Sequence, residues 1–188
     1  MELRRVLSVG RRAAVLAFLA LLLCPFVRGQ KLPALELWGG YSHLRFEGTT
    51  LGFSDQLDLN GWNGGLSLPH IVGGLGAAVD LSGHYTRELE EYNFLIGPQY
   101  SIEWKSLRFY GHGLFGKSRN RLRHPGSTLL EPSSLRRSIA GGGGIDIAFS
   151  QRLSFRVVQA DYLFVSSFGT TQHNLRLSTG LIYRFGKH

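Results

Sequence analysis

Asp80, Ser82 and His84 carry the three side-chain types of a hydrolytic triad within one short segment. They occupy alternate positions, so an extended strand would place all three on one face. A carboxylate, a hydroxyl and an imidazole can serve as orienting group, nucleophile and general base. The spacing therefore allows an enzyme as an alternative function, although it does not by itself predict a catalytic residue.

A second segment matches a nucleotide-binding pattern letter for letter. Residues 111–116, Gly-His-Gly-Leu-Phe-Gly, have the G-x-G-x-x-G spacing, which requires a helix to open at this point. Here the chain instead runs into Ser118-Arg119-Asn120 and then His124-Pro125-Gly126. We therefore predict a strand and no cofactor. No two histidines stand at ligand spacing with a third partner, so no metal site is predicted either.

The elements that carry these residues have a period of two rather than 3.6. In residues 75–85 the odd positions are apolar or aromatic with one glycine, and the even positions are small or polar. Four further segments, around residues 92–104, 107–116, 139–149 and 174–185, repeat this alternation. Across the five segments every charged side chain falls on one face: Asp80, Glu103, Arg108, Asp146, Arg176 and Arg184.

Period alone does not say which face points outward, but three observations indicate that the apolar face does. The apolar faces extend over ten or more residues, close to the 9–11 that a tilted strand needs to cross a bilayer. Aromatic residues gather toward segment ends, as in interfacial girdles. The polar faces are rich in small residues, which suits a narrow lumen. A soluble, lipocalin-like binder with the opposite orientation stays open as an alternative.

The pattern predicts eight strands, of which the first, second and seventh each change phase in a way that a β-bulge would explain. Short connections are expected at residues 69–70, 104–106 and 150–151, and longer ones at 47–56, 87–91, 118–136 and 167–171. Alternating short turns and long loops are typical of transmembrane barrels. We predict an all-β fold, an eight-stranded antiparallel up-and-down transmembrane β-barrel.

The first 29 residues are predicted to be a signal peptide. Four arginines precede an apolar run over residues 13–23, and Val27-Arg28-Gly29 places small residues at the cleavage positions. The barrel domain would then comprise residues 30–188. Removing the leader lowers the net charge from +8 to +4, because the leader holds five Arg and one Glu. This charge is too small to indicate nucleic-acid binding, and the only cysteine, Cys24, leaves with the leader.

Residues 34–185 resemble the small outer-membrane β-barrel family, typified by the membrane domain of outer membrane protein A. The similarity lies in Glu36-Leu37-Trp38-Gly39-Gly40-Tyr41-Ser42, Asn60-Gly61-Trp62, residues 80–85 and Gln159-Ala160-Asp161-Tyr162. The closing strand looks like the signal for barrel-assembly machinery, although Phe185 is not terminal. The resemblance implies a monomer in the bacterial outer membrane that contacts membrane lipid and lipopolysaccharide. Lipid-modifying barrel enzymes share this strand number, but the deacylases' His-x-Ser order is absent here.

The polar face collects charged and imidazole side chains that an eight-stranded barrel would enclose. Its interior is just wide enough to be filled by side chains, and buried charges must be paired. We predict a lumenal lattice of ion pairs rather than a catalytic set, with a narrow channel as an alternative. The residues are Asp80, His84, Glu103, Arg108, His112, Asp146, Arg156, Asp161, Arg176 and Arg184.

A basic segment lies at the longest predicted loop, residues 118–137. It contains Arg119, Arg121, Arg123, Arg136 and Arg137, and Lys117 precedes it. Such a loop is either simply solvated or bound to lipopolysaccharide phosphates. Taken together, the residues predict a structural or surface-interaction barrel with a filled polar interior and no catalytic activity.

Overall fold

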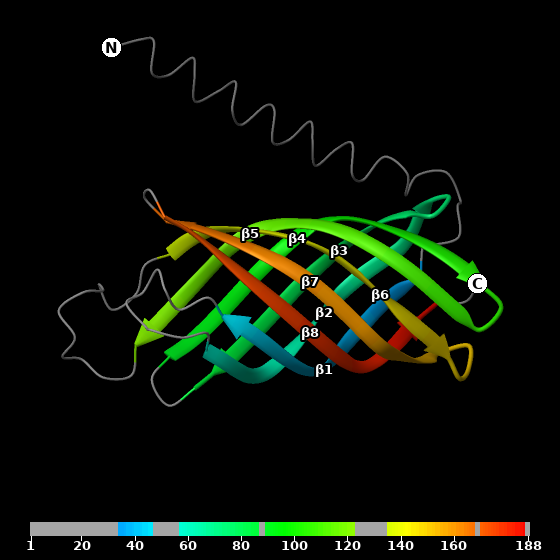
Figure 1. The fold of residues 1–188 in the computed structure, drawn as a ribbon. Helices are drawn as coiled ribbons and strands as arrows, with labels where there is room; N and C mark the ends of the chain where they lie inside the picture. The colour runs from blue at the N-terminus through cyan, green and yellow to red at the C-terminus, as the bar shows by residue number, and fades with distance from the viewer. Residues whose placement is uncertain (1–33, 47–56, 87–88, 123–134, 168–169, 187–188) are drawn as a thin grey trace, which may run out of the picture. The chain divides into compact units, whose positions relative to one another are not determined.

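The computed structural model describes residues 34–46, 57–86, 89–122, 135–167 and 170–186, which form a closed barrel of eight strands (Figure 1). The predicted signal peptide, residues 1–29, lies outside the described residues. None of the described residues forms a helix of the length and apolar character that a membrane span requires. The strands are β1 (Leu35–Phe46), β2 (Leu57–Val72), β3 (Leu75–Tyr85), β4 (Leu89–Trp104), β5 (Leu107–Leu122), β6 (Leu135–Ala148), β7 (Leu153–Ser167) and β8 (Thr170–Phe185).

Each strand pairs antiparallel with its sequence neighbours, and β1 pairs with β8 to close the ring. Leu35 stands opposite Phe185 at the start of that closing pair. The beginning of β1 and the end of β8 therefore lie at the end of the barrel where β2–β3, β4–β5 and β6–β7 connect. We call this the turn end, and the opposite end the loop end. The predicted fold class is confirmed.

The two faces of each strand differ sharply in exposure. On β3, Leu81 is 41% exposed whereas Asp80 and Ser82 are each 1% exposed. Strand β4 alternates between exposed and buried side chains from Leu89 to Ile102. The apolar face therefore points outward and the polar face points into the lumen, as predicted. A soluble lipocalin-like barrel would require the opposite arrangement.

Two of the three predicted phase changes are real irregularities. The β2–β3 register shifts between Leu68 and Val72, and the β7–β8 register shifts between Arg156 and Gln159. The prediction for the first strand was wrong. Strand β1 keeps an uninterrupted register with both neighbours, and Leu44 points inward at 0% exposure. The alternation of apolar and polar residues in β1 is broken because apolar Leu44 faces the lumen, and not because a β-bulge adds a residue to the strand.

Several predicted connections are shorter than expected or lie elsewhere. Strand β2 continues through residues 69–70, and the turn follows at Gly73, whose φ of 60° favours glycine. The long basic loop is also shorter, because β5 extends to Leu122 and β6 begins at Leu135. Its described cations, Arg119, Arg121, Arg136 and Arg137, therefore all lie on paired strands.

Pro98 is accommodated by a gap in one ladder. It pairs with Ala77 of β3, but the β4–β5 pairs pass from Ile96–Phe115 directly to Gln99–His112. The register is the same on both sides of the gap. The missing donor of Pro98 thus interrupts the β4–β5 ladder without displacing either strand.

Candidate functional site: the lumenal polar network

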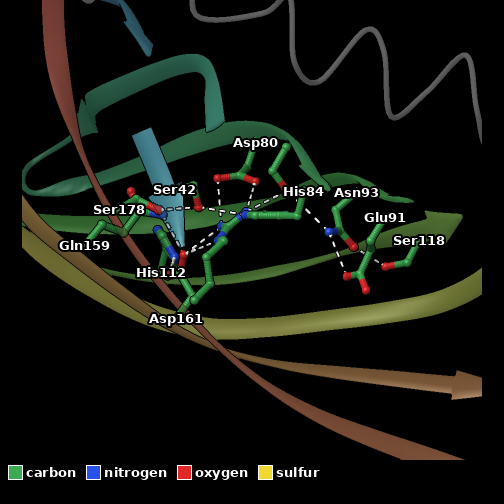
Figure 2. A network of polar contacts seen from close by, with 12 residues as sticks. Ser42, Asp80, His84, Glu91, Asn93, His112, Ser118, Gln159, Asp161 and Ser178 are labelled. Atoms are coloured by element: carbon green, nitrogen blue, oxygen red, sulfur yellow. Dashed lines mark hydrogen bonds and ion pairs between the residues drawn. The ribbon is translucent and has the colours of Figure 1, made fainter. Parts of the chain in front are cut away.

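Arg176 of β8 joins carboxylates from opposite walls of the barrel. Its Nη1 lies 2.7 Å from Asp80 Oδ1 on β3, and its Nη2 lies 2.6 Å from Asp161 Oδ2 on β7. Further bonds run from Nη2 to Asp80 Oδ2 at 2.9 Å and from Nε to Asp161 Oδ2 at 3.0 Å. All three side chains are at most 1% exposed. Because β3 and β7 face each other in the ring, this contact crosses the lumen. Figure 2 shows Asp80 and Asp161 on opposite sides of the network.

His112 completes the group that we call the central cluster, Asp80, His112, Asp161 and Arg176. Its Nε2 lies 2.7 Å from Asp161 Oδ1. Inward-facing Gly142 leaves room for that carboxylate, since a Cβ at this position would overlap Asp161 Oδ1. The glycine run at residues 141–144 is strand, and its inward members admit larger neighbouring side chains, as the sequence suggested.

A second group, the turn-end cluster, contains Glu36, Arg108, Asp146, Arg156 and Arg184. Arg108 of β5 reaches Glu36 of β1 at 2.6 Å and Asp146 of β6 at 2.6 Å. Arg156 and Arg184 bind the same two carboxylates, at 3.0 Å from Asp146 and 2.9 Å from Glu36. Since β1 and β5 also lie on opposite sides of the ring, this cluster crosses the lumen as well.

Gln159 connects the two clusters. Its Oε1 accepts from Arg156 Nη1 at 2.6 Å and from the Tyr110 hydroxyl at 2.9 Å, and its Nε2 donates to Asp161 Oδ2 at 2.7 Å. The Arg156 guanidinium also lies 4.5 Å and 4.6 Å from the rings of Trp38 and Tyr110. Four arginines thus meet four buried carboxylates, so the formal charges of these two residue classes balance: Arg108, Arg156, Arg176, Arg184, Glu36, Asp80, Asp146 and Asp161.

Apolar side chains pack together inside the barrel as well. On β5 Leu114 follows His112 on the inward face, and on β7 Leu163 follows Asp161, each one step nearer the loop end. The lumen is thus filled by paired charges and by leucine packing. The cluster comprises Leu44, Leu59, Ala78, Leu89, Leu95, Leu114, Ala140 and Leu163.

The geometry does not assemble the triad that the sequence allowed. Both oxygens of Asp80 bind Arg176, and Ser82 Oγ accepts from Arg176 Nη1 at 3.1 Å. His84 instead contacts Ser42, with Nε2 2.8 Å from its Oγ. His84 Nδ1 has no hydrogen-bond partner among the described residues, so no third group orients the imidazole.

The Ser42–His84 pair is also closed to a substrate. Both side chains are 0% exposed, and Ser42 Oγ lies 2.9 Å from Ser178 Oγ (Figure 2). Among the described residues no group of three or more His, Cys, Asp or Glu side chains could hold a metal ion. The arrangement can therefore stabilise the lumen, but it presents no accessible nucleophile.

Two other parts of the network lie at the edges of the clusters, and Glu103 Oε1 lies 4.0 Å from Arg184 Nη2. Glu103 is 42% exposed at the turn end, where its Oε1 lies 3.2 Å from His70 Nε2. Toward the loop end Asn93 donates to Glu91 Oε1 at 3.1 Å and accepts from the Ser118 hydroxyl (Figure 2). The sequence placed Glu103 inside the lumen, whereas the structure places it at the rim.

Sequence reasoning missed Glu36 as a network residue. Leu44 broke the alternation of the first strand, so the polar face of that strand was not assigned. The alternation of exposed Leu35 and Leu37 around Glu36 contained the signal. Glu91, Asn93 and Gln159 were also missed, because uncharged or isolated polar residues do not stand out from their neighbours.

No protein-family model matches the sequence. No curated protein matches it either. Solved structures do match. Neisserial surface protein A (NspA) has a TM-score of 0.61 at 14% identity, covering 81% of this chain and 99% of that one. The fold is that of the small outer-membrane β-barrels.

Two further small outer-membrane barrels agree with this fold. Ail, the attachment invasion locus protein of Yersinia pestis, has a TM-score of 0.55 at 16% identity, covering 81% of this chain and 99% of that one. The N-terminal β-barrel domain of Pseudomonas aeruginosa OprF has a TM-score of 0.51 at 12% identity, covering 83% and 100%. These matches support the family resemblance at the level of the fold.

Proposed function

We propose that this chain is a structural or surface-interaction protein of a bacterial outer membrane, without catalytic or channel activity. The observation that carries the proposal is the filled lumen. Arg176 and Arg108 each bridge strands on opposite sides of the ring, and the joined clusters are charge-balanced. A barrel whose described lumen is crossed by ion pairs, and whose Ser42–His84 pair is buried, would act through its outer surface and its ends.

Location in the outer membrane is supported by the outward apolar face. Exposed aromatic residues stand toward both ends of the strands, among them Trp62 and Tyr92 toward the loop end and Trp104 and Phe185 toward the turn end. Such aromatic girdles flank the apolar band of transmembrane barrels. Under this proposal the signal peptide is residues 1–29, barrel-assembly machinery inserts the mature chain as a monomer, and the loop end faces outward. Outer-membrane lipid and lipopolysaccharide would then be its immediate partners.

The first test is heat modifiability. The full precursor is expressed, and the outer-membrane fraction is run on SDS gels with and without heating. We expect a band that shifts on heating, because a folded barrel resists SDS until it is heated. A soluble periplasmic protein with no shift would contradict the proposal.

The second test addresses the channel alternative. Purified folded protein is reconstituted into planar bilayers, and single-channel conductance is recorded. The crossing ion pairs predict no stepwise conductance above that of empty bilayers. Reproducible steps from the wild-type protein would instead favour a narrow channel.

A further inference from the structure

Outward-facing cations cluster at the loop end of β5 and β6. Lys117 and Arg119 lie on β5 and Arg137 on β6, and all three side chains are exposed. We call these three residues the basic cluster. Within the described ranges none of them forms an ion pair, and Arg119 stands opposite Tyr92 and Leu135. Arg121, by contrast, stands opposite Glu90.

The register makes this cluster electrostatically unfavourable in isolation. Lys117 and Arg137 are directly opposite partners in the β5–β6 ladder. Directly opposed like charges destabilise an antiparallel pair. Two cations in this position are therefore stabilised by an anion that both can reach.

An apolar groove lies beside the cluster on the outer face. Its walls include Trp62, Leu81, Tyr92 and Phe94 together with Lys117 and Arg119, and its volume is about 360 Å³. Gly83 lies between Trp62 and Tyr92 in the register. A Cβ there would stand 2.9 Å from Trp62 Nε1, so the glycine lets that ring lie across the strand. The groove thus joins an apolar surface to two cations.

A strip of outward glycines without side chains lies on β5 and β6, toward the turn end. Outward-facing Gly113 pairs with Gly141, and Gly111 pairs with Gly143. The large Phe115–Ile139 pair separates these glycines from the basic cluster. A Cβ added at Gly113 or Gly141 would meet nothing within 4 Å. At about 3.3 Å per residue, Gly113 is ~13 Å along the strand from Lys117. An acyl chain that starts at the basic cluster can reach this glycine strip.

We propose that the outer face of β4–β6 binds a phosphorylated, multiply acylated glycolipid of the outer leaflet. The lipid's phosphates contact Lys117, Arg119 and Arg137, and its acyl chains lie in the groove beside Phe94 and over the glycines of β5 and β6. The site rests on the proposed function, because it requires the loop end to face the outer leaflet. The site extends the proposed function by specifying the class of lipid that this surface binds.

The test measures lipid retention by the purified, refolded barrel in detergent. Bisphosphorylated lipid A is titrated, and the bound fraction is measured by native mass spectrometry. The test variant is Lys117→Gln with Arg137→Gln. The matched control is Lys105→Gln with Arg152→Gln, which removes two exposed cations at the turn end.

We expect the wild type and the control to retain lipid A equally. The test variant should bind on the order of 10- to 30-fold more weakly, because each cation near an anionic surface contributes about a factor of 5. The test variant should fold as well as the wild type in lipid-free detergent, since it removes a like-charge pair. Lipid A without its phosphates should bind the wild type at least as weakly as intact lipid A binds the test variant, which keeps Arg119.

Equal binding by the two variants, or equal binding of the dephosphorylated lipid, would overturn the site. Displacement of lipid A by an equimolar amount of inorganic pyrophosphate would also overturn it, because the acyl chains would then contribute nothing. Gels of the same sample separate the two proposals. A heat-modifiable barrel without lipid selectivity refutes only the site, whereas the absence of a membrane-inserted barrel refutes the site and the proposed function together.

Discussion

Arg176 binds two carboxylates that lie 96 and 15 residues away in the sequence, Asp80 and Asp161, with none of the three more than 1% exposed. Its removal leaves two anions buried in the lumen without their main partner. Arg176→Met should therefore lower the free energy of unfolding by about 3–5 kcal/mol. Urea unfolding of the refolded barrel in detergent, followed by tryptophan fluorescence, measures this change.

The same interaction predicts that the stability losses caused by substitutions at its three residues do not add. In the triple variant Arg176→Met with Asp80→Asn and Asp161→Asn, no ionised group of this contact remains unpaired. The triple variant should be more stable than Arg176→Met alone, because neutral amides cost less to bury than carboxylates. If the three losses simply added, the proposed pairing across the lumen would be wrong.

Two adjacent glycines on β6 provide a matched pair of substitutions. Gly142 faces the Asp161 carboxylate and the Ala160 carbonyl, whereas a Cβ added at the outward Gly141 would meet nothing within 4 Å. Gly142→Ala should cost about 1–3 kcal/mol through overpacking, and Gly141→Ala should be neutral or stabilise by up to ~1 kcal/mol. Thermal shifts of the SDS-resistant band give both values, and equal losses would contradict the inward placement of Gly142.

The outward direction of the apolar face can be tested on β4. Ile96 is 42% exposed and pairs with Val79 and Phe115 in the middle of the apolar band. Ile96→Arg should destabilise the inserted barrel by about 2–4 kcal/mol, as charges do near a bilayer midplane. The control is His43→Arg, near Asp58 at the loop end, with an expected cost of about 0–1 kcal/mol. Lipid vesicles are the appropriate medium, and a tolerated Ile96→Arg would contradict a lipid-facing band.

The enzyme alternative makes a separate prediction about lipid chemistry. Because Ser42 and His84 are buried and Asp80 is held by Arg176, expression of the wild type should leave the acyl pattern of lipid A unchanged. Mass spectra of lipid A from cells with and without the protein test this. An acyl change that disappears in Ser42→Ala, Ser82→Ala or His84→Ala would establish a catalytic role.

The alternation of side chains was sufficient to predict the strand number, the closed antiparallel order and the direction of the faces. These features depend on a local period of two, which residues 75–85 and 92–104 show clearly. Partner identities were beyond the sequence, because Arg108 meets Glu36 only when strands far apart in the chain close a ring. For the same reason the sequence could not show whether Asp80, Ser82 and His84 form a triad. In the structure these side chains contact residues of other strands: Arg176 binds Asp80 and Ser82, and Ser42 contacts His84.

Leu44 and residues 118–122 show where local patterns mislead. An apolar residue that packs against other lumenal leucines looks like a change of phase when its neighbours are unknown. Polar residues at a strand end look like a loop, although Ser118 and Arg119 pair with Arg136 and Leu135. In both cases packing or pairing with a distant strand, rather than local preference, determines the structure.

The crossing ion pairs also bear on how the barrel assembles. Charge balance in the lumen is reached only when β1 and β8 have joined the ring, because Glu36 lies on the first strand, and Arg176 and Arg184 lie on the last. An incompletely closed barrel holds uncompensated charges at membrane depth, where they are expensive. We therefore expect barrel closure to be cooperative, because partly closed intermediates lack the partners of these charges. Under the proposed membrane location, the network inside the lumen would thus favour insertion of the closed barrel over insertion of a partly closed one.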